Sequence, residues 1–393
     1  VQIMRRHRIF IIAIVACFHS LTISSQPRLQ AENIDDVIAA MTLEEKCHLV
    51  LGCGMSYGDD AKFPGTAGST YAIPRLGIPK TYCADSNQGL RMSARRDFDS
   101  RNYFCTDYMT SISLASAWDK DAAYRIGKGI GNETKEYGLD WILAPSMNLM
   151  RNVLCGRNHE YYSEDPYLSG TIAAHYVMGI QSEGTAACVK HFAANSQETN
   201  RNANDSRVSQ RALRELYLRN FELAVRISNP WTVMTAYNSI NGKPTCEDIS
   251  LTETVLRGEW NYKGLVVSDW NAGSNATASM VAGNDMLQPG QDKQYHELLA
   301  NAKNGRLPMA VLDRNVKRIL QFIVKCHNFN NYTYSNEPDL KQHAADDRKI
   351  GAEGMVLLKN ENVLPLLAGQ NVALYGCTSY DIIPGGTGFG GTT

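Results

Sequence analysis

The sequence has no excess of charge of either sign. Its 393 residues include 39 basic and 40 acidic side chains. Proteins that bind nucleic acid or an anionic membrane surface usually carry a clear excess of basic residues. We therefore expect no nucleic-acid partner, and a substrate or ligand that is small and neutral.

Cysteine pairs of the kind that build metal or redox sites are also missing. The ten cysteines are scattered along the chain, and no two of them form a C-x-x-C pair. Zinc sites and thioredoxin-like sites depend on such spacings. We expect no metal and no organic cofactor, and we expect most of the cysteines to be small core residues.

Near the amino end, an apolar run at residues 9–18 follows a basic stretch at residues 5–8. The run is too short to span a bilayer, but a basic stretch followed by such a run is typical of a secretory signal. We expect residues 1–26 to be a signal peptide or a lipoprotein signal. The protein would then be exported to the periplasm, to the outer membrane or out of the cell. In the lipoprotein alternative, a lipid on Cys17 is the only link to a membrane.

The stretch GLVVSDW at residues 264–270 predicts a buried parallel strand that ends in an acid and an indole. Branched apolar residues without alternation are typical of a strand covered on both faces. A carboxylate beside an aromatic ring suits a sugar-cleaving site, where Asp269 reacts with the sugar and Trp270 offers it an apolar face. The alternative is that Asp269 caps the next helix and Trp270 is core packing.

Strand-like and helix-like stretches alternate through residues 27–328. This alternation predicts an α/β fold, a (β/α)8 TIM-like barrel. Polar residues follow several of the apolar strand runs, and active sites in such barrels are built from these strand ends. These residues are Asp85, Lys190, His191, Tyr237 and Asp269. Each could instead be a cap, a solvated charge or core packing, but their shared position favours one site.

Six sequence blocks then occur in a recognisable order. They are ADSNQGLR from residue 84, RNVLCGRNHEYYSEDPYLSG from 151, KHFAANSQETNR from 190, VMTAYNSINGKPT from 233, SDW from 268 and AGNDMLQPG from 282. Together they resemble the family 3 glycoside hydrolases, and in particular their β-glucosidase branch. The N-acetylglucosaminidase branch is disfavoured because no second histidine follows the Lys-His-Phe block.

The resemblance implies that Asp269 is the nucleophile of a retaining mechanism that forms a glycosyl-enzyme. It also implies that a set of further residues surrounds the terminal sugar. These are Asp85, Arg151, Arg157, Lys190, His191, Arg201, Tyr237 and Trp270. For Glu160, Glu164 and Asp165 we expect structural roles, in which they satisfy arginine side chains and backbone donors.

The carboxyl-terminal part of the chain differs in composition from the barrel region. It turns polar after Lys325, which predicts a linker at residues 329–357. The resemblance implies that residues 358–393 begin an α/β sandwich domain that is truncated here. In that family the general acid/base glutamate usually lies in the second domain, so we expect it beyond residue 393.

These observations predict an exported β-glucosidase that removes terminal non-reducing glucose from β-linked oligosaccharides or glycosides, in a form that lacks its acid/base. One alternative is a β-xylosidase of the same family. Another is a noncatalytic carbohydrate-binding barrel. A third is phosphate or nucleotide binding through the glycines at residues 385–391, but the match to such loops is weak because no βαβ unit follows.

Overall fold

The computed structural model describes residues 26–55 and 62–381. The predicted signal, with Cys17, lies outside the described residues except for Gln26, and so do the glycines at 385–391. Within the described part of the chain, none of the helices has both the length and the apolar character needed to cross a bilayer.

A central sheet of six short strands organises the fold. Along the sheet the order is β1 (Gly68–Ser69), β2 (Tyr82–Ala84), β3 (Trp141–Ile142), β4 (Ala186–Phe192), β6 (Thr232–Thr235) and β9 (Leu265–Val267). From β2 to β9 every neighbouring pair is parallel, whereas β1 is antiparallel to β2. Parallel neighbours in chain order require crossover connections, and most of these are helices.

Two short extended segments close this sheet into a ring. Val267 of β9 forms a parallel bridge with Met286, and the adjoining Leu287 bridges Leu51 in the same sense. Gly52 then forms an antiparallel bridge with Thr70, directly after β1. The predicted TIM-like barrel is therefore confirmed, but its closure is irregular. The antiparallel β1 and these one-residue bridges replace regular βα units on that side.

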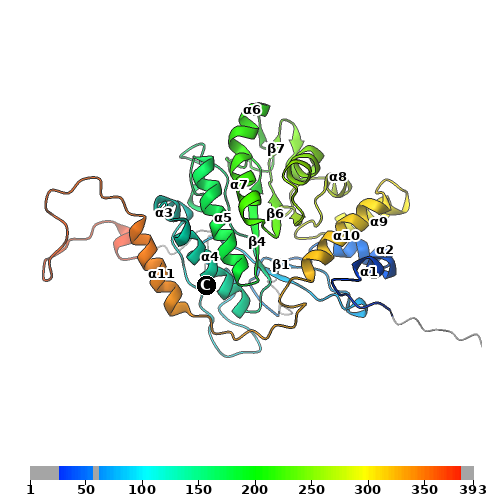
Figure 1. Ribbon diagram of the computed structural model, residues 1–393, viewed down its shortest axis with the longest axis horizontal. Coiled ribbons are helices and arrows are strands. Elements are labelled where there is room, and N and C mark those ends of the chain that lie inside the picture. The colour runs from blue at the N-terminus through cyan, green and yellow to red at the C-terminus, as the bar shows by residue number, and fades with distance from the viewer. Residues whose placement is uncertain (1–25, 56–61, 382–393) are drawn as a thin grey trace, which may run out of the picture.

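Helices surround the ring, as Figure 1 shows. On one side lie α3 (Ser111–Ser116), α4 (Lys120–Glu136), α5 (Pro166–Ser182) and α7 (Arg219–Ser228). On the other lie α1 (Ile34–Ala40), α2 (Leu43–Leu49), α8 (Ala276–Ala282), α9 (Asp292–Lys303) and α10 (Met309–Ile323). In the chain, α6 (Gln210–Ala212) and the π-helical segment η3 (Leu213–Tyr217) come directly before α7, and a second π-helical segment, η5 (Ser250–Glu259), comes between β6 and β9.

A second, smaller sheet has the order β5 (Asp205–Ser206), β7 (Ser239–Ile240) and β8 (Lys243–Pro244). Its strands belong to the connections that follow β4 and β6, so it lies next to the carboxyl ends of those strands. Short 3-10 turns complete the fold. They are η1 (Pro74–Leu76), η2 (Asn158–Glu160), η4 (Thr245–Glu247) and η6 (Cys377–Ser379).

The core has two parts that share the same strands. In β4, Ala187 and Val189 belong to the cluster that includes the helices α4, α5 and α7, whereas Ala186 and Cys188 belong to the cluster that includes α1, α2 and α10. All seven residues of β4 are buried. Because side chains alternate between the two faces of a strand, one strand serves both parts of the core. Its polar residues are therefore confined to its carboxyl end.

Beyond the ring, α11 (Leu340–Glu353) packs against the outside of α4 (Figure 1). His343 Nδ1 lies 2.8 Å from Oε1 of the fully buried Glu133, and Ile350 is also buried. The segment expected as a linker thus contains a helix that is fixed to the barrel. After it, residues 355–381 form no strand within the described part of the chain and expose several large apolar side chains, among them Leu358 and Tyr375.

Helices α4 and α5 approach each other closely at two glycines. A Cβ atom at Gly127 would lie 2.1 Å from the carbonyl oxygen of Tyr176, and one at Gly179 would lie 2.1 Å from that of Tyr124. Both contacts are with backbone, which cannot move aside without shifting a helix. The two positions therefore require the absence of a side chain.

We predict that Gly179→Ala lowers the free energy of unfolding by about 1–3 kcal/mol, as overpacking typically does. Gly351→Ala in α11 is the matched control, because its Cβ would meet only the end of Met109 at 3.9 Å. The control should be neutral or more stable by up to about 1 kcal/mol, since alanine favours helix. Urea unfolding measures both, and equal effects would contradict the close approach.

Candidate active site

A cavity of about 320 Å³ opens at the carboxyl ends of the strands. It brings together the polar residues that follow β2, β6 and β9 and those in the last part of β4, which the sequence pattern placed at one edge. The predicted residues that line it are Asp85, Arg157, Lys190, His191, Arg201, Tyr237, Asp269 and Trp270. Arg151 is not among them. It is exposed and lines a separate cavity with Ser206 and Arg207.

Asp269 follows β9, and its backbone and carboxylate are both held by neighbours. Its N–H donates to the carbonyl oxygen of Thr235 at 3.2 Å, and its Oδ1 accepts the N–H of Trp270 at 2.7 Å. The other oxygen, Oδ2, is buried and has no close hydrogen-bond donor in the described residues. One carboxylate oxygen is thus fixed, and the other is left available to react.

The charge of Asp269 is balanced between opposing effects. Burial raises the pKa of its carboxyl above the ordinary value. The charges of Arg157 and Lys190 act in the opposite direction, as do the N–H of Trp270 and hydrogen bonding by Tyr237. Burial in turn raises the pKa of the Tyr237 hydroxyl, and the Asp269 charge adds to this effect, so Tyr237 stays a neutral donor.

His191 lies between Asp269 and Arg157. Its Nε2 is 3.6 Å from Asp269 Oδ2 and 2.8 Å from Arg157 Nη2. Burial lowers the pKa of His191 well below its ordinary value, and the charges of Arg157 and Lys190 lower it further. The imidazole is therefore neutral. Because an arginine can only donate, Nε2 is the acceptor and its proton is on Nδ1.

Asp85 lines the same cavity and is paired with basic side chains. Lys190 Nζ lies 3.0 Å from its Oδ1, and Arg91 Nη2 lies 3.9 Å from its Oδ2. Arg91 also lines the cavity, although the sequence analysis did not identify it. The backbone N–H of Arg91 donates to the Asp85 carbonyl at 3.1 Å, so the turn that begins at Asp85 returns to it. The signal was present in the ADSNQGLR block, which ends in this arginine.

Two further contacts hold large side chains in place. The indole Nε1 of Trp270 donates to the carbonyl oxygen of Ala67 at 3.1 Å, which fixes the ring at the cavity wall. Arg157 Nε donates to the fully buried Glu160, whose other oxygen accepts from Asn87 Nδ2 at 3.3 Å. The structural role expected of Glu160 is confirmed by these bonds.

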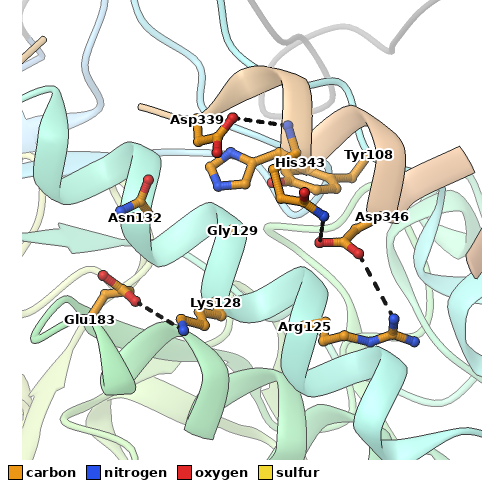
Figure 2. Close-up of a pocket in the computed structure, with 10 residues that line it drawn as sticks. Tyr108, Arg125, Lys128, Gly129, Asn132, Glu183, Asp339, His343 and Asp346 are labelled. Atoms are coloured by element: carbon orange, nitrogen blue, oxygen red, sulfur yellow. Dashed lines mark hydrogen bonds and ion pairs between the residues drawn. The ribbon is translucent and has the colours of Figure 1, made fainter. Parts of the chain in front are cut away.

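A larger groove of about 460 Å³ lies between α4 and α11 (Figure 2). Its charged side chains are paired across the helices, with Arg125 Nη1 3.8 Å from Asp346 Oδ1 and Lys128 Nζ 4.0 Å from Glu183 Oε1 (Figure 2). It lies on the outside of the barrel, away from the strand ends. The cavity at Asp269 lies at the strand ends and is lined by buried charged side chains, so it is the better candidate for chemistry.

The cavity contains the groups that sugar chemistry requires. One carboxylate is buried with a free oxygen, a second is ion-paired and can accept hydroxyl hydrogen bonds, and an indole offers an apolar face. Within residues 26–55 and 62–381, no cluster of three or more His, Cys, Asp or Glu side chains is placed to hold a metal ion.

Comparison with known proteins agrees with this geometry. The Glycosyl hydrolase family 3 N terminal domain matches residues 72–322, so the chain belongs to that family. It is 38% identical to β-glucosidase B of Emericella nidulans over 369 residues, which cover 91% of this chain and 42% of that protein. It is 39% identical to thermostable β-glucosidase B of Acetivibrio thermocellus over 355 residues, which cover 88% of this chain and 45% of that protein.

A solved structure extends the comparison to three dimensions. β-Glucosidase 3B from Thermotoga neapolitana, in complex with α-D-glucose, superposes with a TM-score of 0.89 at 45% identity. The match covers 92% of this chain and 52% of that one. The chain thus spans about half the length of the relatives it matches.

We predict that Asp269→Asn raises the free energy of unfolding at neutral pH, because the amide has no charge to desolvate. The pKa of Asp269 is raised in the folded state, so the stability tied to its proton is complete below the ordinary value of 3.8 and is lost as pH rises through the folded pKa. Each pKa unit corresponds to about 1.4 kcal/mol.

Urea unfolding across a pH series measures this difference. The advantage of Asp269→Asn over the parent should shrink as the pH falls towards 3.8. Asp121→Asn, at an exposed position in the first turn of α4, is the control and should show little effect at any pH. An advantage that grows towards acid pH would show that the pKa of Asp269 is lowered instead.

Proposed function

We propose that this chain carries the nucleophile and the sugar pocket of an exported, retaining β-glucosidase. The observation that supports this most directly is the buried Asp269 carboxylate, with one oxygen fixed and the other without a close donor, beside Trp270. Export is proposed from the sequence of residues 1–26 alone. Membership of the family and the β-glucosidase relatives support the activity.

In this proposal the first chemical step takes place at Asp269. Its Oδ2 attacks the anomeric carbon of the terminal glucose, and the bond from that carbon to the leaving oxygen breaks with its electron pair on the oxygen. The leaving oxygen takes up a proton from a general acid. A water molecule then attacks the same carbon and gives up its proton to the same acid/base group, which restores that group and releases the Asp269 carboxylate.

The other residues of the cavity bind and orient the sugar. Asp85, held by Lys190, accepts hydrogen bonds from sugar hydroxyls, and charge-assisted bonds of this kind are the stronger ones. The indole of Trp270 packs against the C–H face of the ring. Arg157 and Lys190 favour the ionised form of Asp269, which is the form that can attack.

The general acid/base is proposed to lie in the part of the full-length enzyme that this chain does not span. A retaining enzyme needs a second carboxyl group about 5–5.5 Å from the nucleophile. The relatives are about twice as long as this chain, which leaves room for another domain to supply it. Unactivated disaccharides should then react about 10²–10⁴-fold more slowly with this chain than with a full-length enzyme.

We predict that a 2-fluoro glucoside with a dinitrophenolate leaving group labels this chain at Asp269. Such a leaving group needs little protonation, so the first step does not depend on a general acid. Intact-mass measurement and peptide mapping detect the adduct on the peptide that holds Asp269. Asp269→Asn should form no adduct, and Asp121→Asn should react like the parent.

Circular dichroism of each variant first establishes that the protein is folded. An adduct on a different residue would contradict the assignment of the nucleophile. A folded chain that binds glucose but forms no adduct would favour the noncatalytic carbohydrate-binding alternative. The matching 2-fluoro xyloside, which lacks the hydroxymethyl group, should react more slowly, and the reverse order would favour a β-xylosidase.

A further inference from the structure

Two chains of contacts run outward from Asp269. In the first, His191 Nε2 lies 3.6 Å from Asp269 Oδ2 and 2.8 Å from Arg157 Nη2. In the second, Tyr237 favours the charged form of Asp269, and the Arg201 guanidinium carbon lies 4.3 Å from the centre of the Tyr237 ring. Each chain of contacts ends in an arginine that lines the sugar cavity.

Glu198 connects these two arginines. Its Oε1 lies 3.5 Å from Arg157 Nη1, and its Oε2 lies 3.1 Å from Arg201 Nη1. The contacts thus form a closed ring in the order Asp269, His191, Arg157, Glu198, Arg201 and Tyr237, which we call the Asp269 ring. Glu198 does not line the cavity, and its side chain is 27% exposed. It therefore lies outside the cavity, in contact with two residues that line it.

The contact of Glu198 with both arginines has an electrostatic cause. Arg157 has a second carboxylate partner in Glu160, but Glu198 is the only carboxylate within 4.0 Å of Arg201 in the described part of the chain. Two guanidinium groups repel each other, and a carboxylate that contacts both offsets that repulsion. Without Glu198, Arg201 would lose its charged partner, and Arg157 would keep the carboxylate of Glu160 but lose that of Glu198.

We propose that Glu198 is a positioning residue that closes the Asp269 ring and holds Arg157 and Arg201 in place for the attack of Asp269 on the sugar. This inference rests on the proposed function. Nothing in it requires Glu198 to touch the substrate. Its effect reaches the nucleophile through Arg157, whose charge acts on Asp269, and through Arg201, which packs against the Tyr237 ring.

The pKa of Asp269 distinguishes a positioning role of Glu198 from a merely structural one. The charged and titratable groups that act on Asp269 from the neighbouring elements are Arg157, Lys190, His191 and Tyr237. Displacing Arg157 and Tyr237 raises the pKa of Asp269, because both favour its charged form. Removing only the negative charge of Glu198 acts in the opposite direction, since it leaves more positive charge nearby. The sign of the change therefore distinguishes positioning from charge alone.

The experiment compares the parent chain with Glu198→Ala and Glu198→Gln. The first readout is the pKa of Asp269 in the free protein, measured by ¹³C NMR of labelled aspartate and assigned with Asp269→Asn. The second readout is the rate of adduct formation with the 2-fluoro glucoside, separated into its saturating rate and its half-saturating concentration. Glu215→Gln is the matched control, because Glu215 pairs with Arg211 at 3.0 Å on an exposed surface.

We expect Glu198→Ala to raise the pKa of Asp269 and to slow the saturating rate by about 10²-fold, the scale of a misplacement of about 1 Å. Glu198→Gln should change both in the same direction but less, because its carbonyl oxygen can still accept from one arginine. Glu215→Gln should match the parent. If Glu198→Ala does not fold, Glu198→Gln provides the same test.

A lowered or unchanged pKa of Asp269 in folded Glu198 variants would overturn the proposal, and so would a saturating rate equal to that of the parent. If the parent itself forms no adduct, the proposed function fails. The pKa measurement still decides whether the ring holds Asp269, because it needs no substrate.

Discussion

The structure depends on the burial of one charged group, the Asp269 carboxylate at the end of β9. Burial alone would favour the neutral acid, and a neutral acid cannot attack a sugar. Arg157 and Lys190 oppose that effect, but they too are buried and need partners of their own. Glu160 pairs with Arg157, and Asp85 pairs with Lys190. Each buried charge of the site therefore requires an oppositely charged neighbour.

The ring of strands makes this concentration of charge possible. Short parallel strands use up their backbone hydrogen bonds within the sheet, and their carboxyl ends then present side chains to a common space. Asp85 follows β2, Lys190 and His191 end β4, and Asp269 follows β9. The apolar residues of the same strands supply both parts of the core, so the site and the core are built from the same segments.

Much of this was predictable from the sequence, because an apolar run that ends in a polar residue gives both the strand and the direction of its end. The residues predicted at strand ends do line one cavity in the structure. Arg151 was assigned to the sugar by resemblance, yet the structure places it in a neighbouring cavity. Arg91 and Glu198 were missed because they act from turns, where no periodic pattern marks which way a side chain points.

The carboxyl-terminal part shows a different limit of sequence pattern. A polar composition predicted a linker, but α11 within it is fixed to the barrel by the contact between His343 and the buried Glu133. Composition reports average exposure, and it does not reveal that His343 and Ile350 of a mostly polar helix are buried. A contact between residues so far apart in the chain becomes visible only in three dimensions.

The central claim, that Asp269 is the nucleophile, is tested most directly by chemical rescue. In Asp269→Gly the carboxylate is replaced by a space that azide can enter, and the protein is given a dinitrophenyl β-glucoside. The account predicts restored release of dinitrophenolate and an α-glucosyl azide, identified by NMR, because azide attacks from the face that Asp269 occupied. A β-glucosyl azide, or no azide product from the folded variant, would contradict it.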